Sequence, residues 1–76
     1  MAARVRTARE IFATNLRRIR RTKHLSQEGL AHRAGLHRTY VGCLERNEKN
    51  ISIESMERLA KALDVDLVEL LDREKA

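Results

Sequence analysis

The sequence predicts an all-α domain, and three observations support this fold class. The 76 residues contain no proline and three glycines, so few positions interrupt a helix. Apolar residues recur at spacings of three or four, which is the period of an amphipathic helix. Polar residues suited to capping stand before most of these stretches. We find no internal repeat or linker, and a chain of this length is expected to form one domain.

The first helix is expected over residues 8–23. Thr7 and Glu10 have the spacing of a capping box, in which each side chain accepts a hydrogen bond from the other residue's backbone N–H. One apolar stripe along this helix is formed by Phe12, Leu16 and Ile19. The preceding residues, 1–7, are expected to form a flexible N-terminal arm, which leaves 8–76 as the domain.

Two short helices are expected next, over residues 26–33 and 37–46. Ser26 is a good N-cap for the first of them. Gly35 is suited to end it, because glycine adopts positive φ without steric cost. Asn47 can end the second helix in the same left-handed conformation.

The last two helices are expected over residues 52–63 and 66–72, with Ser52 and Asp66 as their N-caps. This region carries more apolar side chains than a small core needs. A surplus of this kind would form an exposed patch on a monomer, so we expect a dimer interface there. Its expected members are Val65, Leu67, Val68 and Leu71.

The two short helices carry a spacing that favours a helix-turn-helix. A small residue is followed after four positions by glycine, and two apolar residues stand six and nine positions after that glycine. These residues are Ala31, Gly35, Val41 and Leu44. The spacing lets two helices cross at about 90–120° over a tight turn. The second helix is then held outward, where it can enter a major groove of DNA.

This spacing lies within the segment LSQEGLAHRAGLHRTYVGCLERN, which resembles the helix-turn-helix domains of lambda-repressor and Xre-like regulators. The resemblance runs from about Phe12 to Leu71 and implies a five-helix fold. A narrower likeness is to the controller proteins of restriction–modification systems, through the RTY of residues 38–40 and the ERN of residues 45–47.

The resemblance implies which residues contact DNA bases. Family members read base edges from the outward face of the third helix, where this chain has Arg38, Thr39, Gly42 and Cys43. Arg38 is the main candidate, since a guanidinium can bond O6 and N7 of guanine together. Gly42 and Cys43 are small and weakly polar, so DNA shape is expected to supply part of the specificity.

The resemblance also implies contacts to the DNA backbone, from the start of the second helix and from the loop after the third. The candidates are Gln27, Tyr40, Arg46, Asn47, Lys49, Asn50 and Arg17. Two of them have a structural alternative: Tyr40 can fill the core, and Arg17 can belong to a solvated face. The chain departs from the family pattern at Gly29, where an acidic residue is usual, and at His37, where a Ser, Thr or Asp cap is common. The second helix is therefore expected to fray more than in relatives.

A structural ion pair is implied between Arg20 and Glu45. Related domains often join an arginine seven residues before the LSQ glutamine to the glutamate that ends the third helix, and these two residues occupy those positions. The alternative is two unrelated surface charges.

Charge divides the chain into two halves. Residues 1–38 contain ten Lys or Arg and two acidic residues, whereas residues 39–76 contain six and nine, for a net charge of +5. On charge alone, a merely soluble surface accounts for this distribution equally well. Because the basic half also contains the helix-turn-helix pattern, the expected partner is double-stranded DNA.

The predicted function is a sequence-specific transcription regulator that acts as a homodimer on a two-fold symmetric operator, with RNA polymerase as a candidate further partner. A phage-type repressor or an antitoxin-like autorepressor remains an alternative within this class. A different class is a protein-interaction module whose basic half binds an acidic protein. Salt-titrated DNA binding distinguishes it from a regulator, because phosphate contacts weaken steeply with salt.

An enzyme is not expected, since we find no carboxylate pair, nucleophile–base pair, phosphate loop or metal-ligand set. Cys43 has no histidine three or four positions away, so a redox sensor or a groove-facing side chain is favoured over a nucleophile. No metal, cofactor or small-molecule ligand is expected. The charged N-terminus and the short apolar runs predict neither a signal peptide nor a membrane segment, and therefore a cytoplasmic protein.

Overall fold

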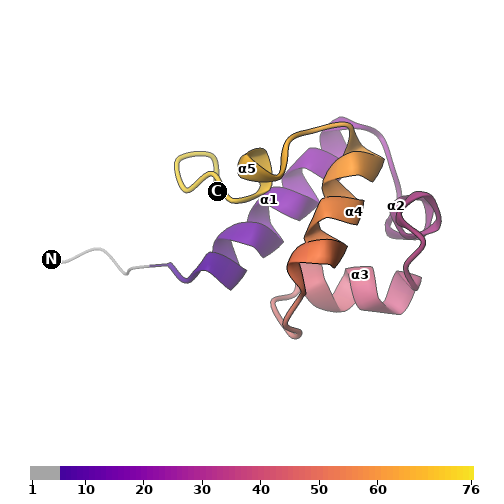
Figure 1. Ribbon diagram of the computed structural model, residues 1–76, viewed down its shortest axis with the longest axis horizontal. Helices are drawn as coiled ribbons and strands as arrows, with labels where there is room; N and C mark the ends of the chain where they lie inside the picture. Colours follow the sequence, from indigo (N-terminus) through magenta and orange to yellow (C-terminus); the bar gives the residue numbers. More distant parts are fainter. Residues whose placement is uncertain (1–5) are drawn as a thin grey trace, which may run out of the picture.

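Five helices and no strand make up residues 6–76, the part of the chain that the computed structural model describes (Figure 1). They are α1 (Ala8–Thr22), α2 (Gln27–Ala34), α3 (Arg38–Glu45), α4 (Ile53–Leu63) and α5 (Leu67–Leu70). This arrangement confirms the predicted all-α, five-helix class. Over the described residues, no helix has the length and apolar character that crossing a bilayer requires.

Most of these helices begin at the caps expected from the sequence. Thr7 Oγ1 accepts a hydrogen bond from Glu10 N (3.1 Å), and Glu10 Oε1 accepts one from Thr7 N (3.0 Å), which completes the capping box of α1. Ser26 Oγ accepts from Gly29 N at 2.8 Å and so caps α2 without an acidic residue at position 29. Ser52 caps α4 in the same way.

Left-handed residues end two of the helices as predicted. Gly35 has φ 69° after α2, and Asn47 has φ 59° just beyond α3. The N–H of Leu36 reaches back to the carbonyl of Ala31 (2.9 Å), so the backbone turns sharply between α2 and α3.

The last helix is shorter than expected and stops at Leu70 rather than at residue 72. Asn15 of α1 supplies a physical reason, because its Nδ2 donates to the carbonyls of Leu70 (3.1 Å) and Asp72 (2.9 Å). These bonds hold the chain after α5 against α1. Asn15 is fully buried, although the sequence analysis did not identify it as part of the core.

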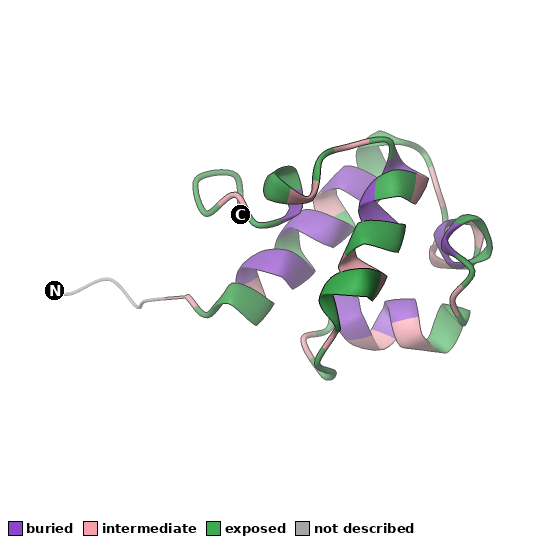
Figure 2. Ribbon diagram, in the orientation of Figure 1, coloured by how far each residue is buried: buried purple, intermediate pink, exposed green. Residues whose placement is uncertain are grey.

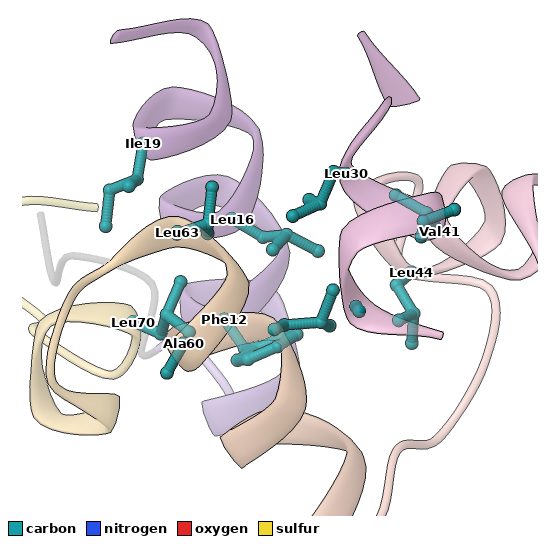
Figure 3. Packing of buried hydrophobic residues seen from close by; sticks show 12 residues of the cluster. Phe12, Leu16, Ile19, Leu30, Val41, Leu44, Ala60, Leu63 and Leu70 are labelled. Carbon is teal, nitrogen blue, oxygen red and sulfur yellow. The ribbon is translucent and has the colours of Figure 1, made fainter. Parts of the chain in front are cut away.

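All five helices contribute to one apolar core (Figure 3). The stripe expected on α1 faces inward, and the side chains that fill the space between it and the other helices include Leu30, Val41, Leu44, Leu63 and Leu70. Figure 2 shows the same division on each helix, with a buried inner side and an exposed outer side. Small residues of α2, Ala31 and Ala34, are also buried, which allows α2 and α3 to approach closely.

The domain begins slightly earlier than expected. Residues 1–5 of the proposed flexible arm lie outside the described residues. Arg6 donates through Nη2 to Thr14 Oγ1 (2.6 Å), and its carbonyl accepts from Nη1 of Arg73 (3.0 Å). Thr7 caps α1. Arg6 and Thr7 are therefore bonded to the folded domain and do not belong to a free arm.

Candidate nucleic-acid interface

The first turn of α3 is an exposed surface at the edge of the domain (Figures 1 and 2). The side chain of Arg38 is 68% exposed, and Thr39 is exposed as well. The opposite side of α3 carries Val41 and Leu44, which are buried in the core. The helix is thus anchored by one face and presents the other, with Arg38 and Thr39 outside the fold.

His37 is the N-cap of α3. Its Nδ1 accepts a hydrogen bond from the backbone N–H of Thr39 at 3.1 Å. An imidazole nitrogen therefore serves as the hydrogen-bond acceptor in place of the Ser, Thr or Asp oxygen that is usual at this position. Although His37 replaces the usual Ser, Thr or Asp, the first turn of α3 is still capped.

Arg38 contacts Glu28 across an open groove of about 580 Å³ between α2 and α3. The distance from Arg38 Nη1 to Glu28 Oε2 is 3.6 Å, and the Glu28 side chain is 75% exposed. An ion pair this exposed contributes little free energy, so Arg38 can exchange Glu28 for another partner at small cost.

Gly42, one of the expected base-reading positions, lines the same open groove as Arg38 and Thr39 but is covered there by other side chains. It is buried, because the side chains of Arg46 and Gln27 cover it. A Cβ at position 42 would lie 3.2 Å from Arg46 Nη1 and 3.4 Å from Gln27 Oε1. Arg46 also donates to Cys43 Sγ (3.6 Å), and Cys43 is half-buried. The surface expected for Gly42 and Cys43 is therefore occupied largely by the guanidinium of Arg46.

The ion pair implied between Arg20 and Glu45 is present and nearly buried. Arg20 donates through Nε to Glu45 Oε2 (2.6 Å) and through Nη2 to Glu45 Oε1 (3.0 Å), with the two side chains 11% and 3% exposed. The hydrogen bond to Glu45 raises the pKa of Arg20, while burial acts in the opposite direction. Gln27 Nε2 donates to the same carboxylate (3.1 Å), and Arg20 also bonds the carbonyl of Leu25 (2.8 Å). One carboxylate therefore joins α1, the start of α2 and the end of α3.

The loop between α3 and α4 is attached to α1 by a residue that the sequence analysis did not identify. Arg9 donates through Nε to Asn47 Oδ1 (2.7 Å) and through Nη1 to Asn50 Oδ1 (2.9 Å). The hydroxyl of Tyr40 donates to the carbonyl of Asn50 at 3.2 Å, so its proton has an internal acceptor. Lys49, in the same loop, is exposed. Arg9 lies 38 and 41 positions from its partners, and no local pattern connects residues so far apart.

Arg17 belongs to the same side of the molecule as the helix-turn-helix. It is exposed on α1 and lines a shallow groove together with Gln27 and Arg46. The structure thus gathers three of the expected backbone contacts around one groove.

The apolar patch expected near the C-terminal end is smaller than the sequence suggested. Val68 is 76% exposed and Leu71 is 38% exposed. Val65 and Leu67 are only partly exposed, because they pack against the core. Of the four expected interface residues, Val68 and Leu71 carry the exposed apolar surface.

Comparisons with known proteins agree with this geometry. A family model described as "Helix-turn-helix" matches residues 16–70. Control protein C.SmaI of Serratia marcescens is 47% identical over 66 residues, which cover 87% of this chain and 79% of that protein. Control protein C.BamHI of Bacillus amyloliquefaciens is 43% identical over 65 residues, which cover 84% and 80%.

Solved structures are similar as well. The restriction–modification controller protein C.AhdI from Aeromonas hydrophila matches with a TM-score of 0.79 and 45% identity, over 82% of this chain and 94% of that one. The wild-type restriction–modification controller protein C.Esp1396I matches with a TM-score of 0.83 and 32% identity, over 93% and 95%. The family model, the relatives and the exposed second helix of the pair lead to one assignment. The chain belongs to the helix-turn-helix family, in its lambda-repressor-like (Xre-like) class of DNA-binding transcription regulators.

Proposed function

We propose that this protein is a sequence-specific regulator that binds a two-fold symmetric operator as a homodimer and controls a restriction–modification system, including its own expression. The similarity to proteins named as control proteins, over more than four fifths of the chain, supports the controller role. This similarity favours a controller over a phage-type repressor or an antitoxin-like autorepressor.

The observation that carries the DNA-binding proposal is the exposed first turn of α3. Arg38 stands there with a side chain 68% exposed and with one weak ionic partner. A helix of this kind enters the major groove, where the Arg38 guanidinium can bond O6 and N7 of a guanine. Thr39, the next residue and also exposed, would contact a thymine methyl group or a phosphate.

Contacts to the phosphate backbone would flank α3 on two sides. Gln27 and Arg17 line one groove beside it, and the exposed loop containing Lys49 and Asn50 lies at its other end. Such contacts set the position of the protein on the duplex and supply most of the affinity, without selecting a sequence.

A homodimer would place two copies of α3 in successive major grooves about 34–36 Å apart. Val68 and Leu71 offer exposed apolar surface for this contact, and they belong to the acidic half of the chain rather than to the basic half that would face DNA. A symmetric interface uses the same surface on both subunits, so each subunit contributes its own patch to the apolar area that is buried.

Autoregulation would follow from how many operator sites the protein occupies as its concentration rises. A dimer bound at a first site would activate transcription through RNA polymerase, and further binding as the protein accumulates would repress it. The protein would act in the cytoplasm, where both its operator and polymerase are found.

The test is selection of bound sites from a random pool of duplexes, followed by binding measurements at several salt concentrations. We expect a symmetric pair of half-sites whose centres lie about one helical turn apart. We also expect the affinity to fall by at least about 10³-fold between 50 and 200 mM salt. Absence of DNA binding at low salt would refute the proposal and favour a protein partner for the basic half.

A further inference from the structure

We infer that Arg9 is a positioning residue for DNA binding: it holds Asn47 and Asn50 by their side-chain oxygens and so leaves their amide nitrogens free to bind phosphate. This inference rests on the proposed function, because it assigns a task to the loop that would contact the DNA backbone. It adds a residue of α1 that neither the sequence pattern nor the helix-turn-helix unit includes.

The geometry is that of a bridge. Arg9 Nε lies 2.7 Å from Asn47 Oδ1, and Arg9 Nη1 lies 2.9 Å from Asn50 Oδ1. A guanidinium presents its N–H groups in a rigid plane, so one arginine can fix two acceptors relative to each other. The Tyr40 hydroxyl holds the carbonyl of Asn50 at 3.2 Å and gives the loop a third attachment.

The bridge determines which side-chain atoms of Asn47 and Asn50 remain available to bind phosphate. A carboxamide has one oxygen that accepts and one nitrogen that donates, and phosphate oxygens bind only donors. With each Oδ1 occupied by Arg9, the groups left for an outside partner are the two Nδ2 atoms. Neither Nδ2 has an acceptor among residues 6–76. Both asparagines are therefore oriented as donors before DNA arrives.

The backbone of the loop is consistent with this role. Asn47 has φ 59°, a conformation that glycine adopts most readily and asparagine tolerates. A glycine there would end α3 equally well but would offer nothing to Arg9. The carboxamide thus accounts for an asparagine at a position where the backbone alone would favour glycine.

The competing explanation is that Arg9 binds phosphate itself, since it is exposed and cationic. Salt dependence separates the two roles. Each phosphate that a cation neutralises steepens the plot of log affinity against log salt by about 0.9, whereas a neutral amide donor does not contribute to this slope. If Arg9 only positions the asparagines, removing it lowers the affinity and leaves the salt slope unchanged. If Arg9 contacts phosphate directly, removing it changes both the affinity and the slope.

The experiment compares Arg9→Ala, Arg9→Lys and wild type for binding to the operator duplex obtained by selection, over a range of salt. We expect Arg9→Ala to weaken binding about ten-fold, which corresponds to the partial loss of two hydrogen bonds, with an unchanged slope. Arg9→Lys should restore little, because an ammonium keeps the charge but lacks the rigid fork. The control is Arg58→Ala, which removes an exposed charge of α4 that forms no bond with the described residues, and should have less than a two-fold effect.

A double-mutant cycle completes the test. In the background Asn47→Gly with Asn50→Ala, which keeps the backbone conformation of the loop, adding Arg9→Ala should change affinity less than two-fold. Full additivity in this background, or a slope reduced by about 0.9 per protomer, would overturn the inference in favour of direct phosphate contact. Wild-type protein that binds no duplex at all would instead refute the proposed function, so the two failures are distinguishable.

Discussion

The guanidinium of Arg20 and the carboxylate of Glu45 form a two-pronged ion pair, with hydrogen bonds of 2.6 and 3.0 Å and almost no exposure to solvent. Because Gln27 bonds the same carboxylate, the pair fixes how α2 and α3 meet at the end of α1. The orientation of the exposed helix therefore depends on one buried charge. Removing a single partner from such a pair is costly, since the other charge is left desolvated and unpaired.

Glu45→Ala should lower the free energy of unfolding by roughly 3–5 kcal/mol, which a chemical denaturation curve measures. The matched control is Glu48→Ala, which breaks the exposed pair between Arg46 and Glu48 (3.1 Å) and should cost at most about 1 kcal/mol. A melting temperature for Glu45→Ala equal to that of wild type would contradict a structural role for the pair.

The pKa of Arg20 sets the pH range over which its charge contributes. Because the hydrogen bond to Glu45 raises this pKa, the charge is present in both the folded and the unfolded chain at neutral pH. Its stabilising contribution is complete below the unfolded value and is lost only as pH rises through the higher folded value. Titration of Arg20 therefore cannot make stability pH-dependent near neutrality.

Features set by neighbouring residues were predictable from the sequence. The capping box of Thr7 and Glu10, the left-handed stop at Gly35 and the apolar stripe of α1 each depend on residues a few positions apart. The pair of Arg20 and Glu45 came from a family pattern rather than from such a rule. The position of α3 followed from the same resemblance, together with the spacing around Gly35.

Features that join distant residues were not predictable. Arg9 meets the loop at Asn47 and Asn50, and Asn15 meets carbonyls more than 50 positions away. Hydrogen bonds of this kind depend on how helices pack, and no periodicity in the sequence encodes them. The burial of Gly42 was missed for a related reason, since it depends on the direction taken by the flexible side chain of Arg46.

Gly42→Ala should separate stability from DNA binding. The new methyl group would meet Arg46 Nη1 at 3.2 Å, and the end of a flexible side chain can move away at little cost. Replacing glycine inside a helix also gains up to about 1 kcal/mol, so the melting temperature should be unchanged or raised. Displacement of Arg46 should weaken operator binding, as a fluorescence titration would measure. In the background Arg46→Ala the same substitution should have no further effect on affinity, and a persistent loss there would show that Arg46 is not involved.

Asn15→Leu should loosen the segment after α5. Leucine has a similar size, but it leaves the carbonyls of Leu70 and Asp72 without their donor. The cost is about 1–3 kcal/mol for the buried carbonyl of Leu70 and less for the partly buried carbonyl of Asp72. We expect a lower free energy of unfolding and faster hydrogen exchange in residues 67–72. An exposed residue of α4 provides the control, since Glu57→Gln should leave exchange in that segment unchanged. Equal exchange in Asn15→Leu and wild type would mean that core packing alone holds the segment.

Val68→Lys should shift the proposed homodimer toward monomer without unfolding the domain. The side chain is 76% exposed, so a charge there costs the isolated fold little, whereas at an apolar interface it would be desolvated. Sedimentation should show the dimer dissociation constant rising at least about ten-fold. Ile53 is also apolar and 62% exposed, at the start of α4, and Ile53→Lys is the control. Loss of the dimer in Ile53→Lys but not in Val68→Lys would move the interface from α5 to the start of α4.

Arg38→Ala and Lys49→Ala should weaken DNA binding in different ways, because we propose that Arg38 contacts a base and that Lys49 contacts a phosphate. Arg38→Ala should cost about 1–3 kcal/mol on the selected operator, have a smaller effect on random duplex, and relax the preference at one base step. Lys49→Ala should weaken binding to both duplexes alike and reduce the salt slope by about 0.9 per protomer. Glu28→Gln tests whether the ion pair with Glu28 affects DNA binding by Arg38, since it removes the charge that attracts the guanidinium across the groove. We expect it to leave the base preference intact and to raise affinity for every duplex, because a carboxylate beside the binding surface repels phosphate. If Arg38→Ala and Lys49→Ala changed specific and random binding in the same ratio, the division between base and backbone contacts would be wrong.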